Sequence, residues 1–137
     1  MQQLSHPFPP LYDDRSRILI LGSFPSVKSR ETAFFYGHPQ NRFWRVLAQL
    51  LDVPVPQTVE EKSALLHAHH IALWDVIASC RIEGSSDSSI RDAAPNDLTP
   101  ILQAAPIRAV FCNGASSYAL YQKHQAKATG LAAVQLP

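Results

Sequence analysis

Apolar and polar positions follow two different periods along this chain, and these periods predict strands and helices in turn. Continuous apolar runs, typical of strands buried on both faces, cover residues 17–21, 71–77, 107–112 and 132–136. Helices, the first of them with apolar residues at helical spacing, are predicted over residues 41–51, 59–69, 98–105 and 115–124. Because strand and helix alternate without an internal repeat, we expect an α/β fold: a parallel sheet with helices on both faces.

The segments between these elements are predicted from their turn and capping residues. Thr58 is expected to cap the second helix, with Glu60 and Glu61 in the first turn, where the helix dipole favours negative charge. The proline-rich residues 1–10 cannot sustain a helix and are expected to form an extended arm. Residues 78–89, which are rich in Ser and Gly, are expected to form a loop.

Polar side chains mark the ends of three of the four predicted strands. Ser23 follows the first strand, Asp75 lies near the end of the second, and Asn113 follows the third. Ligands of open parallel sheets bind beyond these carboxyl ends, so we expect a binding pocket there. Asp75 and Asn113 each have a second interpretation of equal weight, as caps of the segment that follows.

The loop over residues 22–44 carries the most candidate chemistry. Gly22 lets the backbone approach a ligand closely, and Pro25 stiffens the turn. Tyr36 can stack on a nucleobase, a contact worth about 1–3 kcal/mol. Asn41 offers an amide donor and a carbonyl acceptor, so it can position a water or read a base edge. Capping the following helix is an equally good interpretation of Asn41, and the two roles are compatible.

The other residues of this loop are less specific. His38 can hydrogen-bond the loop backbone or contact the ligand. Phe43 and Trp44 are expected in the core, since aromatic residues at helical spacing usually pack there. Arg42 and Arg45 lie on the other side of that helix, where they can touch phosphate or form a solvated face.

Composition changes this picture mainly by exclusion. With 137 residues the chain is long enough for one domain with one core. The 12 Lys and Arg residues against 11 Asp and Glu residues give a net charge of +1, which is no global signature of nucleic-acid binding. Contacts with DNA would therefore depend on local patches.

Cysteine usage and hydropathy indicate a cytoplasmic protein with no membrane partner. Cys80 and Cys112 form neither a metal-ligand spacing nor a disulfide framework and are expected to be reduced, buried thiols. No apolar run approaches the roughly 18 residues that span a membrane. The amino-terminal segment lacks the basic start and apolar stretch of a signal peptide.

Several familiar chemistries are missing from the sequence. His67, His69 and His70 have no cysteines or carboxylates at ligand spacing, so no metal site is expected. A phosphate-binding glycine loop, GxGxxG, HExxH and a nucleophile elbow are all absent. This argues against nucleotide hydrolases, dehydrogenases, metalloproteases and esterases.

Four parts of the sequence are characteristic of one protein family: Leu21–Ser26, Phe35–Trp44, Leu73–Ile77 with Ser85–Ile90, and Phe111–Gly114. Through these stretches the chain resembles the uracil-DNA glycosylase superfamily, and within it the hypoxanthine-DNA (deoxyinosine) glycosylase branch. The likeness runs over about residues 17–137. The second of these stretches is the most specific, because its order His-Pro-x-Asn-Arg-Phe-Trp also appears in mismatch-specific uracil glycosylases.

The resemblance implies a fold and a reaction. The fold is a three-layer α/β/α sandwich around a mainly parallel, four-stranded sheet. The reaction is hydrolysis of the N-glycosidic bond of a deaminated base flipped out of DNA, as part of base-excision repair. It implies a monomer acting on double-stranded or single-stranded DNA that contains hypoxanthine or uracil, without a metal or redox cofactor.

The resemblance also assigns roles to residues. Many family members carry Asp or Asn where this chain has Phe24, and a phenyl ring cannot orient a water. The branch that this chain resembles uses the downstream asparagine instead, which maps onto Asn41 as the catalytic residue, and Tyr36 maps onto the aromatic residue that stacks on the base. The implied base-binding residues are Gly22, Ser23, Phe24, Pro25, Tyr36, His38, Asp75 and Asn113. Those implied for the DNA backbone are Ser26, Lys28 and Arg42.

Family members continue past the strand that matches residues 134–137 with a Ser-Pro-rich loop, which inserts into DNA, and a helix. We therefore expect residues 1–137 to form a single glycosylase-like domain without that carboxyl-terminal part. Two alternatives stay open. One is a mismatch-specific uracil or thymine glycosylase, and the other is a truncated, non-catalytic DNA-binding remnant.

Overall fold

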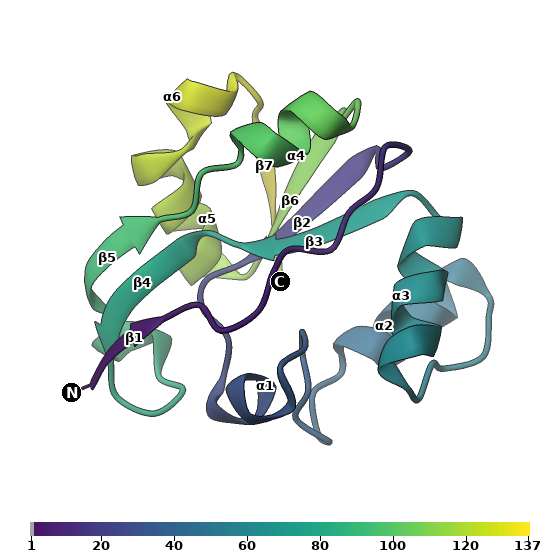
Figure 1. Ribbon diagram of the computed structural model, residues 1–137, viewed down its shortest axis with the longest axis horizontal. Helices are drawn as coiled ribbons and strands as arrows, with labels where there is room; N and C mark the ends of the chain where they lie inside the picture. Colours follow the sequence, from purple (N-terminus) through teal and green to yellow (C-terminus); the bar gives the residue numbers. More distant parts are fainter. Residues whose placement is uncertain (1) are drawn as a thin grey trace.

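The computed structural model describes residues 2–137 and contains two sheets of different kinds (Figure 1). The first is a parallel sheet with the strand order β3-β2-β6-β7. Its strands are β2 (Ile18–Gly22), β3 (Ile71–Asp75), β6 (Ala109–Asn113) and β7 (Ala133–Leu136). The second is an antiparallel sheet with the order β1-β4-β5. Its strands are β1 (Gln2–Ser5), β4 (Ile77–Ile82) and β5 (Arg91–Pro95).

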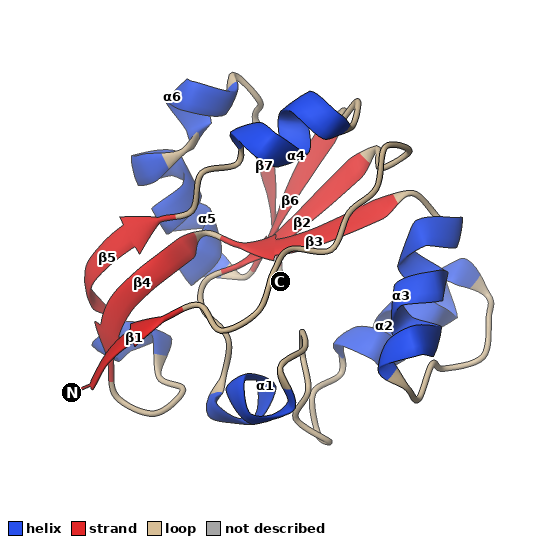
Figure 2. Ribbon diagram, viewed as in Figure 1, coloured by secondary structure: helices blue, strands red, loops and turns tan. Residues whose placement is uncertain are grey.

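Helices flank the parallel sheet on both sides (Figure 2). Helix α3 (Val59–Ala68), with α2 (Phe43–Leu51) behind it, lies beside β3, while α5 (Ala115–His124) contacts β6 and β7 and is followed by α6 (Ala126–Thr129). The shorter helical segments are α1 (Val27–Thr32), the 3-10 turn η1 (Asp87–Ser89) and α4 (Thr99–Ala104). The α/β/α arrangement around a four-stranded parallel sheet confirms the predicted fold class.

Strands β2 and β3 are buried because helices cover both faces of their sheet. All five residues of β3 are buried, and Leu19 and Leu21 of β2 have no exposed surface. Continuous apolar runs suit this environment, since neither side of such a strand meets water. Trp44, predicted for the core, is buried and its Nε1 donates to the Phe35 carbonyl oxygen at 3.1 Å.

The predicted cap of α3 is confirmed. The Thr58 hydroxyl accepts from the Glu61 backbone N–H at 3.0 Å, and the Glu61 carboxylate accepts from the Thr58 N–H at 3.2 Å. The same carboxylate also accepts a hydrogen bond from the Gln57 N–H at 2.8 Å. The bonds from Gln57 and Thr58 together lower the pKa of Glu61. This reciprocal pairing satisfies backbone donors that the first turn of a helix leaves free.

The segment after β3 was predicted wrongly. Residues 71–77 do not form one strand, because β3 ends at Asp75 and β4 begins at Ile77. Residues 78–82, predicted as the first part of a loop, all belong to a strand. In β4 the buried Cys80 and Ile82 alternate with the exposed Arg81, and β1 and β5 pair with its two edges.

The amino-terminal arm, predicted as extended, is tied to both sheets; its first residue, Met1, lies outside the described residues. Strand β1 pairs with β4, and Leu11 exchanges backbone hydrogen bonds of 3.0 and 2.9 Å with Leu73 at the edge of the parallel sheet. Phe8, between these two anchors, is buried in the core. Over residues 2–137, no helix is both long and apolar enough to cross a membrane.

We expect Thr58→Ala to lower the free energy of unfolding by about 1 kcal/mol, because it removes the side-chain acceptor from the capping box of α3. Thr58→Ser keeps a hydroxyl at the same place and should retain most of the stability. Urea denaturation followed by circular dichroism measures both. Equal midpoints for Thr58→Ala and the wild type would contradict a contribution from the cap.

Candidate active site

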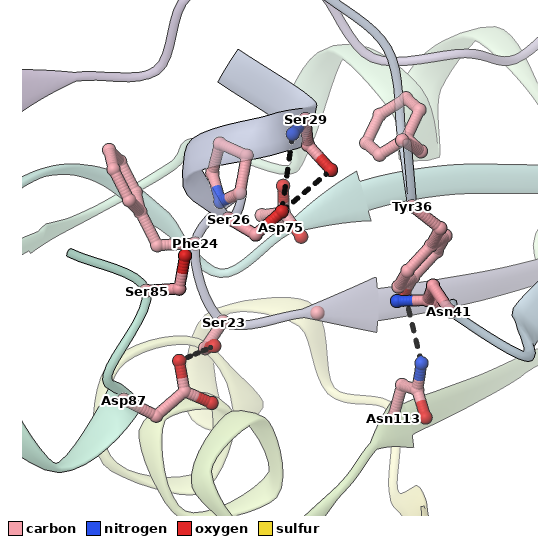
Figure 3. Close-up of a pocket in the computed structure, with 13 residues that line it drawn as sticks. Ser23, Phe24, Ser26, Ser29, Tyr36, Asn41, Asp75, Ser85, Asp87 and Asn113 are labelled. Carbon is pink, nitrogen blue, oxygen red and sulfur yellow. Dashed lines mark hydrogen bonds between the residues drawn. The ribbon is translucent and has the colours of Figure 1, made fainter. Parts of the chain in front are cut away.

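A cavity of about 170 Å³ lies at the carboxyl ends of β2, β3 and β6 (Figure 3). In the parallel pairing Gly22 lies opposite Asp75, and Leu21 lies opposite Cys112, one residue before Asn113. The register thus brings three strand ends, distant in sequence, to adjacent points. The cavity is lined by Gly22, Ser23, Phe24, Pro25, Ser26, Ser29, Phe35, Tyr36, Asn41, Asp75, Ser85, Asp87 and Asn113.

Gly22 leaves the space that the neighbouring polar groups occupy. A Cβ at this position would lie 2.5 Å from Oδ1 of Asp75 and 3.4 Å from the Tyr36 hydroxyl. The first distance is far below van der Waals contact, so any side chain here would displace the Asp75 carboxylate. The glycine is therefore required for the close approach of Asp75, whereas the approach of a ligand, which the sequence predicts, stays a prediction.

Tyr36 is held in a conformation that its backbone does not favour. Its φ is +54°, a left-handed value that costs an L-residue about 1 kcal/mol. The ring stacks on Phe43 with 4.0 Å between centroids and 17° between planes. Asn113 Nδ2 donates to the Tyr36 hydroxyl at 3.2 Å (Figure 3). Phe43 thus occupies one face of the ring, and a ligand that stacks on Tyr36 must use the other.

Carboxyl groups dominate the electrostatics of the cavity. Burial, with the nearby charge of Asp75, raises the pKa of the Tyr36 hydroxyl, which therefore stays protonated. At the other end of the cavity, Ser23 Oγ donates to Asp87 Oδ1 at 2.8 Å (Figure 3). Asp87 is exposed as a residue, but its carboxyl group faces the cavity, where desolvation and then the charge of Asp75 raise its pKa. The cavity is suited to groups that donate hydrogen bonds or carry positive charge.

Asn41 reaches the cavity from the start of α2. The Oδ1 of Asn41 accepts from the Phe43 backbone N–H at 2.9 Å, and the backbone N–H of Asn41 donates to the His38 carbonyl at 2.9 Å. The helix begins at Phe43 rather than at the predicted residue 41. Asn41 thus lies one residue before the N-cap, Arg42, whose side chain makes no capping hydrogen bond, and its Oδ1 serves the first N–H of the helix in the manner of a cap. The same hydrogen bond fixes the orientation of the amide at the cavity wall.

Hydrogen bonds fasten the loop over residues 83–89 to the loop after β2. The Ser85 hydroxyl accepts from the Val27 N–H at 2.8 Å, and Arg30 Nη2 donates to the Gly84 carbonyl at 2.6 Å. Ser26 caps α1 by accepting from the Ser29 N–H at 3.2 Å. These contacts hold Ser23, Ser26 and Asp87 on one side of the cavity.

Three of the predicted site residues do not line this cavity. His38 is exposed, and its Nδ1 accepts from the Gln40 N–H at 3.1 Å. It lines a neighbouring hollow together with Arg45 and Lys62. Lys28 and Arg42 are exposed, and Lys28 Nζ lies 3.6 Å from a carboxylate oxygen of Glu31.

Sequence reasoning missed several residues that the structure brings to the site. Ser29, Phe35, Ser85 and Asp87 line the cavity, although Ser85 and Asp87 fall within a stretch that carries the family resemblance. His6 was missed altogether. Its Nε2 lies 2.7 Å from Asp75 Oδ2, and the two side chains are only 4% and 7% exposed. Nothing in the local sequence around His6 indicates a contact with a residue 69 positions away.

The histidines near the end of α3 do not converge on one point with other ligands. His67 Nδ1 lies 3.1 Å from Asp13 Oδ2. Across residues 2–137, no three His, Cys, Asp or Glu side chains are grouped so that they could hold a metal ion. Cys80 and Cys112 are free and buried.

We expect Asp87→Asn to stabilise the protein at neutral pH and to have no such effect at strongly acid pH. A carboxyl whose pKa is raised on folding stabilises the fold while protonated and loses that contribution as the pH rises through the folded pKa. Asparagine keeps an acceptor for the Ser23 hydroxyl but cannot ionise. Thermal unfolding over a pH series measures the difference, with Glu83→Gln, an exposed carboxylate of the same loop, as control. A lower melting temperature for Asp87→Asn than for the wild type at neutral pH would contradict this account.

Comparison with known proteins agrees with the fold. The family model described as the uracil DNA glycosylase superfamily matches residues 9–135. A protein of Methanosarcina barkeri named hypoxanthine DNA glycosylase is 36% identical over 113 residues, which are 80% of this chain and 71% of that protein. One of the same name from Methanosarcina acetivorans is 37% identical over 109 residues, 78% of this chain and 69% of that protein.

A solved structure extends the likeness to three dimensions. The solution NMR structure of a protein from Methanosarcina acetivorans superposes with a TM-score of 0.84 at 32% identity. The match covers 99% of this chain and 84% of that one. With the family model spanning nearly all of its sequence, this chain belongs to the uracil DNA glycosylase superfamily.

Proposed function

We propose that this protein is a DNA glycosylase that hydrolyses the N-glycosidic bond of a deaminated base, with hypoxanthine as its main substrate. The observation that carries the proposal is the cavity where Tyr36, Asn41, Asp75 and Asn113 meet at the ends of three parallel strands. The names of the two relatives from Methanosarcina support hypoxanthine as the base. The cavity volume of about 170 Å³ suits a single base flipped out of the duplex.

The polar groups of the cavity complement a deaminated base. Hypoxanthine presents a ring N–H and a carbonyl oxygen on the edge where adenine presents a ring nitrogen lone pair and an amino group. Asp75 can accept from the ring N–H, and the amide groups of Asn41 and Asn113 can donate to a carbonyl oxygen. The free face of Tyr36 provides the stacking surface. Uracil also presents a ring N–H beside carbonyl oxygens and is therefore included as a second substrate.

In this proposal Asn41 is the catalytic residue that positions the attacking water. One lone pair of its Oδ1 accepts from the Phe43 N–H, and the second is available to a water. Because α2 fixes that amide, the side chain of Asn41 loses no further conformational freedom when it binds the water. Holding a reactant in place in this way is the main contribution of a positioning group. The bond breaks toward a sugar cation, and the carboxylates of Asp75 and Asp87 favour the positive charge that develops.

The DNA backbone is proposed to run across the rim of the cavity. Lys28 and Arg42 are exposed on α1 and at the start of α2, on either side of the loop that holds Tyr36. Ser26, two residues before Lys28, lines the cavity and is the third proposed backbone contact, although its hydroxyl donates to Ser29 Oγ at 3.1 Å in the free protein. Because the net charge is only +1, binding must depend on such local contacts and should weaken steeply with salt. We further propose that the protein is a cytoplasmic monomer and that residues 1–137 form a single domain.

A mismatch-specific uracil or thymine glycosylase is a second candidate, favoured by the His38–Trp44 motif that such enzymes share. Release from G·U, G·T and inosine-containing duplexes separates the two, because only the mismatch enzyme prefers the first two substrates. Salt-sensitive binding of all three duplexes without any base release would instead identify a DNA-binding remnant.

We expect Asn41→Ala and Asn41→Ser to lower the single-turnover rate of hypoxanthine release by about 100-fold, since both remove the amide that positions the water. Serine is a good helix cap, so Asn41→Ser should keep the stability of the wild type. Gln49→Ala, an exposed amide on the same helix, is the matched control and should release base at the wild-type rate. Wild-type activity in Asn41→Ser would show that residue 41 acts only as a cap.

A further inference from the structure

We propose that His6 is a positioning residue, which holds Asp75 so that only one carboxylate oxygen, acting as an acceptor, faces the base. The inference rests on the function proposed above and assigns a role in base discrimination to the amino-terminal arm. His6 follows directly after β1, and its backbone N–H donates to the Ala78 carbonyl at 2.7 Å. The arm is therefore anchored where the imidazole reaches Asp75.

The imidazole of His6 lies in a cluster of aromatic rings. Its centroid is 4.3 Å from that of Trp74, 4.6 Å from Phe8 and 5.9 Å from Phe24. Only 4% of the side chain is exposed. In such surroundings a polar atom without a partner is costly. Nε2 has its partner in Asp75 Oδ2 at 2.7 Å, whereas Nδ1 is buried and has none among the described residues.

These contacts select one protonation form of the ring. A charged imidazolium, or a neutral ring with its proton on Nδ1, would bury an N–H donor with no acceptor. A neutral ring with its proton on Nε2 leaves only a lone pair unpartnered and gives Asp75 Oδ2 a hydrogen bond. The geometry therefore has Nε2–H donating to Oδ2.

The remaining oxygen of Asp75 determines what the cavity accepts. Oδ1 lies against Gly22 at the cavity wall, where the absence of a side chain leaves it accessible. With Oδ2 engaged by His6, the carboxylate presents a single, oriented acceptor. A base with a ring N–H can donate to it, as hypoxanthine and uracil do. Adenine would set a lone pair against it, and a buried polar group left unpaired is a strong ground for rejection.

A double-mutant cycle tests this role. His6→Met removes the donor but keeps a side chain of similar length, and His6→Gln keeps an N–H near the place of Nε2. Phe8→Leu, the control, disturbs the same aromatic cluster without touching Asp75. Each is made in the wild type and in Asp75→Asn, and kcat/KM is measured on an inosine-containing duplex.

We expect His6→Met to lower kcat/KM by about tenfold or more, the effect of losing one hydrogen bond to a charged group. His6→Gln should stay within about threefold of the wild type. In the Asp75→Asn background, His6→Met should have little further effect, because the two residues act as a unit. Equal losses in both backgrounds, or the same loss in His6→Met and Phe8→Leu, would overturn the proposal.

The protonation form of the His6 ring can also be measured directly on the wild-type protein, without a variant and without an activity assay. Long-range ¹H–¹⁵N correlation spectra of the histidine rings identify the form of His6. We expect a neutral ring with its proton on Nε2, and a proton on Nδ1 would overturn the inference. If the wild type releases no base from any substrate, the proposed function fails, while the spectrum still decides how His6 meets Asp75.

Discussion

The parallel register between β2 and its two neighbours is the constraint on which the rest of the structure depends. Because Gly22 lies opposite Asp75, with Asn113 one strand away, three residues distant in the sequence become neighbours at one edge of the sheet. A shift by one residue would turn each of them to the opposite face. The burial of β2 and β3 prevents such a shift, since it would expose their apolar side chains.

The same burial sets the chemistry above the sheet. The cavity floor belongs to strands with almost no contact with water, so charges there are weakly screened. This is why one carboxylate, Asp75, contributes to raising the pKa both of Tyr36 and of Asp87, which lie at opposite ends of the cavity. The left-handed backbone of Tyr36 is held in place by contacts from two other elements, Phe43 in α2 and Asn113 in β6.

The predictions from sequence were correct where an element depends on residues that are close together in the chain. Helix α5 begins and ends at the predicted residues, and the cap of α3 is the predicted one, because both depend on residues within one turn. The polar strand ends that meet in the cavity were also identified in advance. Strands β1 and β5 and the continuation into β4 were not, because their pairing joins short segments with weak periodicity of their own.

His6 shows why part of a site escapes sequence analysis altogether. Its contact with Asp75 spans 69 positions and depends on the antiparallel pairing of β1 with β4, which no local sequence pattern predicts. That pairing has a consequence for the dynamics of the molecule. Strand β1 lies at the edge of its sheet, and edge elements open locally at a lower free energy than a buried parallel sheet. The Asp75 carboxylate is thus supported on one side by an edge strand, whose local opening is expected to cost less free energy, and on the other by the buried parallel sheet.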